Sequence, residues 1–201
     1  MAGLRQAQKQ MTRRLLLEKA LALFDEQGYA ATTIDDIAAS VGMTRATFYL
    51  HFASKAELMR ALTDITNEML TSSDRPPLPT VVASGDRMLI KTWLARKFDQ
   101  WPEIRPYVMA AHQAAGIEPV IQTFLDDWFD TAIGDMVAGL DEAGRFVPAD
   151  RRPRCALAFG QLEFISRRWM RLGWVVDRDV TLELMTDSWY QLLADGPTTT
   201  A

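Results

Sequence analysis

The sequence has little of what secreted, metal-binding or membrane-spanning proteins depend on. Its 201 residues contain one cysteine, Cys155, and two histidines, His51 and His112. A single cysteine excludes a disulfide within the chain, and two histidines far apart do not make a metal site. No apolar run approaches the roughly 20 residues of a membrane-spanning helix, and no N-terminal stretch has the pattern of a secretion signal. We therefore expect a cytoplasmic protein with no metal, no other cofactor and no membrane contact.

Positive charge is scarce overall but concentrated near the N-terminus. The formal net charge of -4 at pH 7 would disfavour binding to phosphate if it were spread evenly. Residues 1–60 hold eight Lys and Arg against six Asp and Glu, which is +2, and the remainder is therefore -6. The N-terminal part is the candidate nucleic-acid-binding part. The basic residues at its start either grip DNA or form a merely solvated face; these are Arg5, Lys9, Arg13 and Arg14.

Strand patterns are missing as well. No segment alternates apolar and polar residues between hairpin turns, whereas apolar residues recur at helical spacing almost throughout. The sequence predicts an all-α protein of about nine helices. After three N-terminal helices and one over residues 54–72, we expect helices over residues 85–101, 103–115, 118–142, 150–174 and 179–194. The prolines within residues 73–79 predict a connector, and a mobile tail is expected from Gly196.

The N-terminal helices are predicted from their caps. A first helix should begin near Met11 or Thr12 and end at Gly28. Thr33, with Asp36 three residues later, is suited to cap a short second helix that Gly42 ends. Thr44 is suited to cap a third helix only two residues later. Two short helices joined by so tight a turn predict a helix-turn-helix, whose second helix enters the major groove of DNA.

The predicted third helix carries the candidate DNA contacts. Arg45, Ala46 and Thr47 lie near its N-terminus and are the predicted base readers. Arg45 has two donors for a guanine edge, and Ala46 or the Thr47 methyl group fits a thymine methyl group. Free amides at helix starts, a phenol, an imidazole and an ammonium group are suited to phosphate. The predicted phosphate contacts are therefore Thr33, Thr44, Tyr49, His51 and Lys55.

The string from Thr32 to Phe52, followed by Lys55 and Leu58, resembles the N-terminal signature of the TetR family of DNA-binding transcription regulators. The resemblance covers about a quarter of the chain. It implies DNA contacts at the residues named above and places Leu50 against a sugar or a thymine methyl group. It also implies a helix-turn-helix DNA-binding domain over residues 1–56, followed by an effector-binding and dimerisation domain over residues 57–201.

Large apolar side chains crowd the predicted second domain, and most of them are needed for a helical core. The family resemblance implies a ligand cavity among them, and the composition favours a bulky, largely apolar effector. Core packing is the alternative interpretation for every candidate. The candidate lining residues are Trp93, Trp101, His112, Gln113, Phe124, Trp128 and Trp169.

The resemblance further implies a homodimer formed by the last two long helices. Ala156 and Gly160 are small enough for close helix approach, and complementary charge comes from Glu163, Arg167 and Arg171. In a monomer the same face would simply be solvated. Two-fold symmetry predicts a palindromic operator with half-sites about 34 to 36 Å apart or a multiple of that distance. Cys155, at the start of this face, is either a redox switch or a buried small hydrophobe.

The hypothesis from sequence is a homodimeric repressor of double-stranded operator DNA. An effector would displace the helix over residues 54–72, change the separation of the two reading heads and release the DNA. One alternative is an activator or DNA-binding co-regulator of the same fold without a small-molecule effector. Another is an enzyme that merely carries a helical N-terminus, but no serine, histidine and acid arrangement suggests catalysis.

Overall fold

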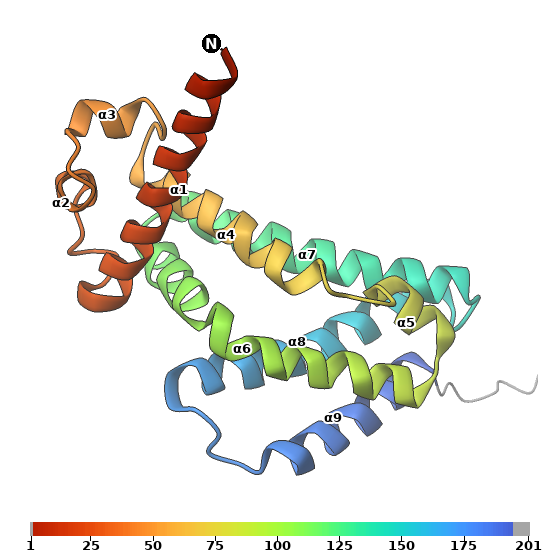
Figure 1. Cartoon of the computed structure of the whole chain (residues 1–201). Coiled ribbons are helices and arrows are strands. Elements are labelled where there is room, and N and C mark those ends of the chain that lie inside the picture. Colours follow the sequence, from red (N-terminus) through yellow and green to blue (C-terminus); the bar gives the residue numbers. More distant parts are fainter. Residues whose placement is uncertain (1, 195–201) are drawn as a thin grey trace, which may run out of the picture. The chain divides into compact units, whose positions relative to one another are not determined.

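The computed structural model describes residues 2–194, and the predicted tail from Gly196 lies outside this range. The described chain is all-helical, as predicted, with nine helices and no strand (Figure 1). None of these helices is long and apolar enough to cross a membrane. The helices are α1 (Ala2–Gln27), α2 (Ile34–Ser40), α3 (Arg45–Tyr49), α4 (Lys55–Thr71), α5 (Leu78–Ser84), α6 (Arg87–Ala115), α7 (Pro119–Glu142), α8 (Pro148–Leu172) and α9 (Arg178–Leu193).

The expected start of the first helix is wrong by about two and a half turns. The prediction followed the apolar stripe, which begins at Leu16, whereas α1 begins at Ala2. Residues 2–10 are mostly alanine, leucine, glutamine, arginine and lysine, all of which favour helix without needing a buried face. The first turns of α1 are therefore helical but exposed.

Prolines account for the other two differences. The predicted connector contains the start of α5, because Pro77 is its N-cap and Pro79 lies in its first turn, where a missing amide donor costs nothing. The expected helices over residues 85–101 and 103–115 are one helix, α6, which continues through Pro102. Trp101 and Ile104 are buried on either side of that proline, and their packing outweighs one lost backbone hydrogen bond. The total of nine among the described residues is thus reached with one helix gained and two joined.

Two compact units divide the chain. The first contains residues 1–69 and 104–126, and the second contains residues 70–103 and those from 127 onward. The division follows packing, and α4, α6 and α7 each supply residues to both units. The predicted functional boundary at residue 56 remains a prediction.

The core of the first unit joins the N-terminal helices to parts of α6 and α7. From α1, Leu16, Ala20 and Phe24 point into it, and Ile37 and Phe48 come from α2 and α3. It is completed by four residues from much later in the chain, Ala110, Ala111, Ala114 and Ile121. The helix-turn-helix is therefore packed against segments that lie about 60 residues or more further along the sequence.

The second unit contains a buried ion pair. The side chains of Lys97 on α6 and Asp74, just after α4, are 6% and 7% exposed, and Lys97 Nζ donates to the two carboxylate oxygens at 2.8 and 2.9 Å. Lys97 also donates to the carbonyl of Leu70 near the end of α4, and Trp93 Nε1 donates to Asp74 at 3.1 Å. Burial lowers the pKa of Lys97, although the contact with Asp74 acts in the opposite direction. This network fixes the end of α4 against α6.

The α8–α9 pair forms another part of the second unit (Figure 1). Gln161 on α8 donates to the hydroxyl of Ser188 on α9 at 2.8 Å. Arg145, between α7 and α8, donates to the carbonyls of Val82 and Ala83 at the end of α5, each at 2.8 Å. The bonds of Arg145 add donors at the end of α5, where the amide of Gly85 also donates to the carbonyl of Val82 at 3.2 Å.

Candidate nucleic-acid interface

The caps predicted for the first two short helices are present. Thr33 Oγ1 accepts from the amide of Asp36 at 3.1 Å, and the Asp36 carboxylate accepts from the amide of Thr33 at 2.8 Å. This reciprocal pair is the capping box expected from the spacing. Thr44 Oγ1 accepts from the amide of Thr47 at 3.3 Å and so begins α3. The two caps fix where α2 and α3 start.

The turn between α2 and α3 depends on Gly42. Its φ of +68° lies in the left-handed region that glycine adopts without steric cost. The turn closes when the amide of Met43 donates to the carbonyl of Ala38 at 2.9 Å. Behind it, Ala38, Phe48 and Phe52 are buried, so the two helices share one small core. The geometry is that of a helix-turn-helix.

Arg45 lies on the exposed side of α3, and its guanidinium group donates to two hydrogen-bond acceptors. Its guanidinium group donates to Asp35 at 2.9 Å and to the hydroxyl of Tyr49 at 3.2 Å. The Arg45 and Asp35 side chains are 55% and 61% exposed, so their ion pair contributes little to stability and is readily exchanged. The sequence prediction omits Asp35, because no spacing rule pairs a residue of α2 with one ten positions later.

The other predicted DNA contacts near α3 are also accessible. Thr33, Thr44, Ala46, Tyr49 and Leu50 are exposed. Leu50 has 72% of its surface in solvent. Thr47 is half-buried because its hydroxyl lies 3.1 Å from that of Thr44. DNA contact by each of these residues stays a prediction.

Lys55 has a structural role that the sequence did not indicate. Its Nζ donates to the carbonyls of Tyr29 and Thr32 at 2.8 and 2.9 Å and lies 4.1 Å from the centre of the Tyr29 ring. Burial lowers its pKa, while the nearby Glu118 carboxylate raises it. Two of the three ammonium donors are therefore engaged in joining the start of α4 to the loop before α2. One N–H donor of the Lys55 ammonium group remains for the predicted phosphate contact.

Tyr29 connects the same loop to α6 and to the turn before α7. Its amide donates to Gln113 Oε1 at 2.9 Å, and its hydroxyl donates to Glu118 at 2.5 Å. Burial raises the pKa of Tyr29, and the hydrogen bond to Glu118 raises it further, so the phenol stays protonated. Gln113, a candidate effector contact, is thus engaged in holding the loop that precedes the helix-turn-helix.

His51 lies at the C-terminal end of α3 beside two cations of α1. Its Nδ1 is buried and has no hydrogen-bond partner among the described residues. Its pKa is lowered from 6.5, first by burial and then by the charges of Lys9 and Arg13. The imidazole is therefore neutral at pH 7.

The double substitution Lys9→Gln and Arg13→Gln is expected to raise the pKa of His51. Both changes remove a positive charge that disfavours the imidazolium form, whereas burial of the ring remains. An NMR titration of the His51 ring protons measures the shift. Arg14→Gln is the control, because Arg14 does not contribute to the lowered pKa. A His51 pKa unchanged by the double substitution would contradict the placement of the two cations.

The predicted effector residues are divided between the two units. His112, Gln113 and Phe124 belong to the first unit, and the four tryptophans belong to the second. There Trp93 stacks on Trp189, with ring centres 5.6 Å apart, and Trp128 contacts Phe129 and Phe159. Phe124 lies under the guanidinium group of Arg60, 4.6 Å from it. His112 is half-buried.

Trp101 and Trp169 are the one predicted pair whose rings the structure brings together. Their ring centres are 5.6 Å apart, and Trp174 lies 5.4 Å from Trp101 in a stacked arrangement. Phe98 contacts both Trp101 and Trp174, at 4.4 and 5.1 Å. Within the described part of the chain, the buried Nε1 of Trp169 has no hydrogen-bond acceptor. We call these four residues the aromatic group; Phe98 and Trp174 were not among the predicted lining residues.

The predicted dimer residues lie along α8. Ala156, Gly160, Arg167 and Arg171 are exposed, and Glu163 is half-buried with its carboxylate 3.1 Å from Arg167 of the same helix. Cys155 is buried. Burial, reinforced by Asp141, raises the pKa of its thiol to about 12, which leaves no reactive thiolate at neutral pH. Of the two interpretations of Cys155, the structure favours the buried small hydrophobe.

Known proteins resemble the chain in two ways. Residues 16–62 match the family model described as bacterial regulatory proteins, tetR family. TcmR of Streptomyces glaucescens, an HTH-type transcriptional regulator, is 48% identical over 64 residues, which cover 32% of this chain and 27% of TcmR. IcaR of Staphylococcus epidermidis, a negative transcriptional regulator of the biofilm operon icaADBC, is 42% identical over 45 residues. Those residues cover 22% of this chain and 24% of IcaR.

The fold is shared over a greater length. A TetR-like transcriptional regulator from Rhodococcus sp. RHA1 superposes with a TM-score of 0.64 at 20% identity, covering 91% of this chain and 96% of that one. The N-terminal helix-turn-helix is therefore one of the TetR family type, as residues 16–62 show. The chain spans only about a quarter of the length of the curated relatives it matches.

Proposed function

We propose that the chain is a homodimeric repressor that binds a palindromic, double-stranded operator through α2 and α3. A bulky, largely apolar small molecule would release it. The observation that carries the proposal is Arg45, an exposed guanidinium group at the start of α3 on a helix-turn-helix fixed by its own core. Arginine in this place is suited to read a guanine in the major groove. Repression is favoured by the similarity to IcaR, which is a negative transcriptional regulator.

The aromatic group supports an effector of this class. Several large rings in mutual contact provide apolar surface for a bulky ligand, and most ligand sites of proteins are lined in this way. Trp169 Nε1 is a buried donor without an acceptor among the described residues. A buried donor of this kind is costly to leave unpaired. The proposed effector therefore carries one hydrogen-bond acceptor on an otherwise apolar body.

Exposed apolar side chains on α8 support the dimer. Leu157 and Phe164 are 62% and 63% exposed, and with Gly160 between them they lie on one face at helical spacing. Large apolar groups on one exposed face mark an interaction surface. Sedimentation equilibrium tests the assembly, and a monomer at every protein concentration would contradict it. The cytoplasmic location remains a prediction.

Arg45→Ala is expected to weaken binding to a duplex selected from a random-sequence pool by about 1–3 kcal/mol, which is roughly 5- to 150-fold. It should also relax the base preference at one position of each half-site, since alanine cannot bind the guanine edge. Arg152→Ala is a matched control. Arg152 is 56% exposed and also pairs with a carboxylate, Asp130, but it lies on α8. Fluorescence anisotropy measures the affinities, and repeated selection measures the preference.

Unchanged affinity and unchanged base preference of the Arg45 variant would contradict DNA reading by α3. Ligand release is tested separately by titrating apolar compounds that carry one acceptor into the protein–duplex complex. The affinity for DNA should fall as the ligand binds, and the fluorescence of the aromatic group should change with it. If compounds of every class leave the affinity unchanged, the co-regulator without an effector becomes the better interpretation.

A further inference from the structure

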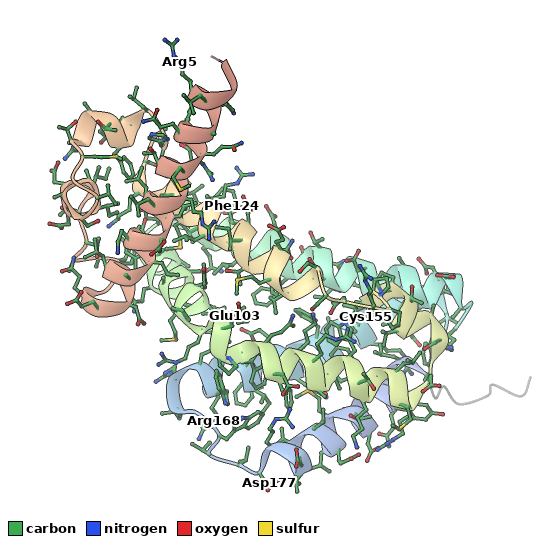
Figure 2. The ribbon with its side chains drawn as sticks, in the orientation of Figure 1. Arg5, Glu103, Phe124, Cys155, Arg168 and Asp177 are labelled. Atoms are coloured by element: carbon green, nitrogen blue, oxygen red, sulfur yellow. The ribbon has the colours of Figure 1, made fainter. Side chains whose placement is uncertain are left out.

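The first turns of α1 extend beyond the core of the first unit. Residues 4–11 are all exposed, and Leu4 and Met11 have 78% and 67% of their surface in solvent. Figure 2 shows Arg5 near the free end of this helix. A helical segment that buries no apolar face gains little stability from packing. Its side chains are therefore available to an outside partner.

The exposed turns of α1 carry positive charge along one face. Leu16, Ala20 and Phe24 form the buried stripe of α1. Positions 9 and 13 continue that stripe toward the N-terminus at the same spacing of three and four residues, and there it is occupied by Lys9 and Arg13. Arg5 extends it by one more turn. One face of α1 is thus apolar at Leu16, Ala20 and Phe24, where it packs on the helix-turn-helix. The same face is cationic nearer the N-terminus, where the helix extends beyond the core.

Two observations place this cationic face beside the end of α3. The guanidinium carbon of Arg13 lies 4.8 Å from the ring centre of Phe52, and Lys9 and Arg13 both act on the neighbouring His51. Within the described chain none of the three cations is paired with a carboxylate, and the first acidic residue in the sequence is Glu18. Lys9 and Arg13 therefore border the end of the predicted DNA-reading helix, and Arg5 lies one turn beyond Lys9 along α1.

We propose that Arg5, Lys9 and Arg13 form a basic ridge that binds the phosphates of duplex DNA flanking the half-site read by α3. This inference rests on the proposed operator binding and adds a second contact surface to it. From residue 5 to residue 13 the ridge is about 12 Å long, which matches about three to four base-pair steps. Its contacts are to the backbone and carry no base preference.

Duplex DNA is the partner favoured by position and charge together. A ridge continuous with the reading surface meets the phosphates of the same duplex without any further binding event. The overall charge of -4 makes the chain unlike a protein that binds polyanions over its whole surface. Residues 1–60 carry a net charge of +2 and the remainder -6, so the attraction for DNA phosphate is greatest at the N-terminal part that holds the predicted groove contacts.

The test uses the full chain and two lengths of a duplex selected from a random pool. The long duplex carries ten extra base pairs of arbitrary sequence beyond each half-site, and the short duplex ends at the half-sites. The ridge variant, Lys9→Gln with Arg13→Gln, removes two charges of the ridge. Adding Arg5→Gln removes the third. Arg14→Gln with Lys19→Gln is the matched control, because it removes two charges from other faces of α1. Circular dichroism melting checks that each variant is folded.

On the long duplex, the ridge variant is expected to bind with a shallower dependence on salt. The slope of log K against log salt concentration should fall by about 0.9 for each phosphate that the variant no longer binds, which is roughly tenfold in affinity per phosphate near 0.1 M salt. On the short duplex the ridge variant should match the wild type, and the selected base sequence should not change. The control variant should match the wild type on both duplexes.

Three outcomes would contradict the proposal that the ridge binds flanking phosphates. They are wild-type affinity of the ridge variant on the long duplex, an equal loss on both duplexes, or an equal loss in the control variant. In each of these the wild type still binds its selected duplex, so the proposed function stands while the ridge fails. If the wild type selects no duplex at all, the operator binding and the ridge fail together. The single Lys9→Gln variant, exposed and remote from the core, repeats the test with the least perturbation.

Discussion

Gly139→Ala is expected to destabilise the second unit by about 3 kcal/mol, the upper end of the range for overpacking. A β-carbon at Gly139 on α7 would lie 2.4 Å from the carbonyl oxygen of Pro79 and 2.9 Å from Val82 Cβ. The first contact is with backbone at the start of α5, which cannot rotate away as a side chain would. Relief requires α5 and α7 to separate, and that exposes the buried Val81 and Val82.

Gly134→Ala is the control for this prediction. Gly134 lies on the same helix, and a β-carbon there meets nothing within 4 Å. Alanine is favoured over glycine in a helix by up to about 1 kcal/mol, so this variant should be slightly more stable than the wild type. Urea unfolding monitored by circular dichroism measures both changes. Equal stabilities for the two variants would contradict the close approach of α5 and α7.

Asp74→Ala is expected to cost about 3–5 kcal/mol, because it leaves the buried Lys97 without its partner. Trp93 Nε1 loses its acceptor in the same variant. The loss should depend on pH in a defined direction. Burial already lowers the pKa of Lys97, and without Asp74 the pKa falls further from the 10.5 of the unfolded chain. Below 10.5 the unfolded state then binds more protons, so the free energy of unfolding rises as the pH is raised toward that value.

A second variant separates the ion pair from the general packing of the site. Asp74→Leu combined with Lys97→Met removes both charges and should recover most of the stability, because no buried charge is left unpaired. Recovery should be incomplete, since the indole of Trp93 still lacks an acceptor. Thermal unfolding over a range of pH measures both variants. If the Asp74→Ala variant were as stable as the wild type, the prediction would be wrong. Lys97 would then reach water when its partner is removed.

The helix-turn-helix could be predicted from the sequence because its signals are local. Thr33 and Asp36 are three residues apart, Gly42 needs a left-handed backbone, and Thr44 follows two positions later. Each feature acts within one helical turn, and the structure confirms each cap. Arg45 could likewise be placed on the exposed side of α3. What α3 contacts on DNA is still a prediction from chemistry.

The remaining features depend on contacts that no local pattern records. The bonds of Lys55 to the carbonyls of Tyr29 and Thr32 reach more than 20 residues back along the chain. An exposed lysine and a half-buried one look the same in sequence, so the phosphate interpretation was the only one available. The tryptophans of the predicted cavity are similarly alike in sequence, yet Trp93 stacks on Trp189 and Trp101 contacts Trp169, whereas Gln113 supports Tyr29.

The core of the first unit is built from segments that are far apart in the sequence, and this affects folding during synthesis. The helix-turn-helix is complete in sequence by about residue 55, yet its core also needs Ala110, Ala114 and Ile121. During synthesis, the apolar faces of α1 and α4 must wait for the ribosome to deliver those later turns before they are fully covered. A fragment cut after α4 would keep the signature of its family and lack part of its own interior. The helix-turn-helix is therefore recognisable in the sequence before the residues that complete its core have been made.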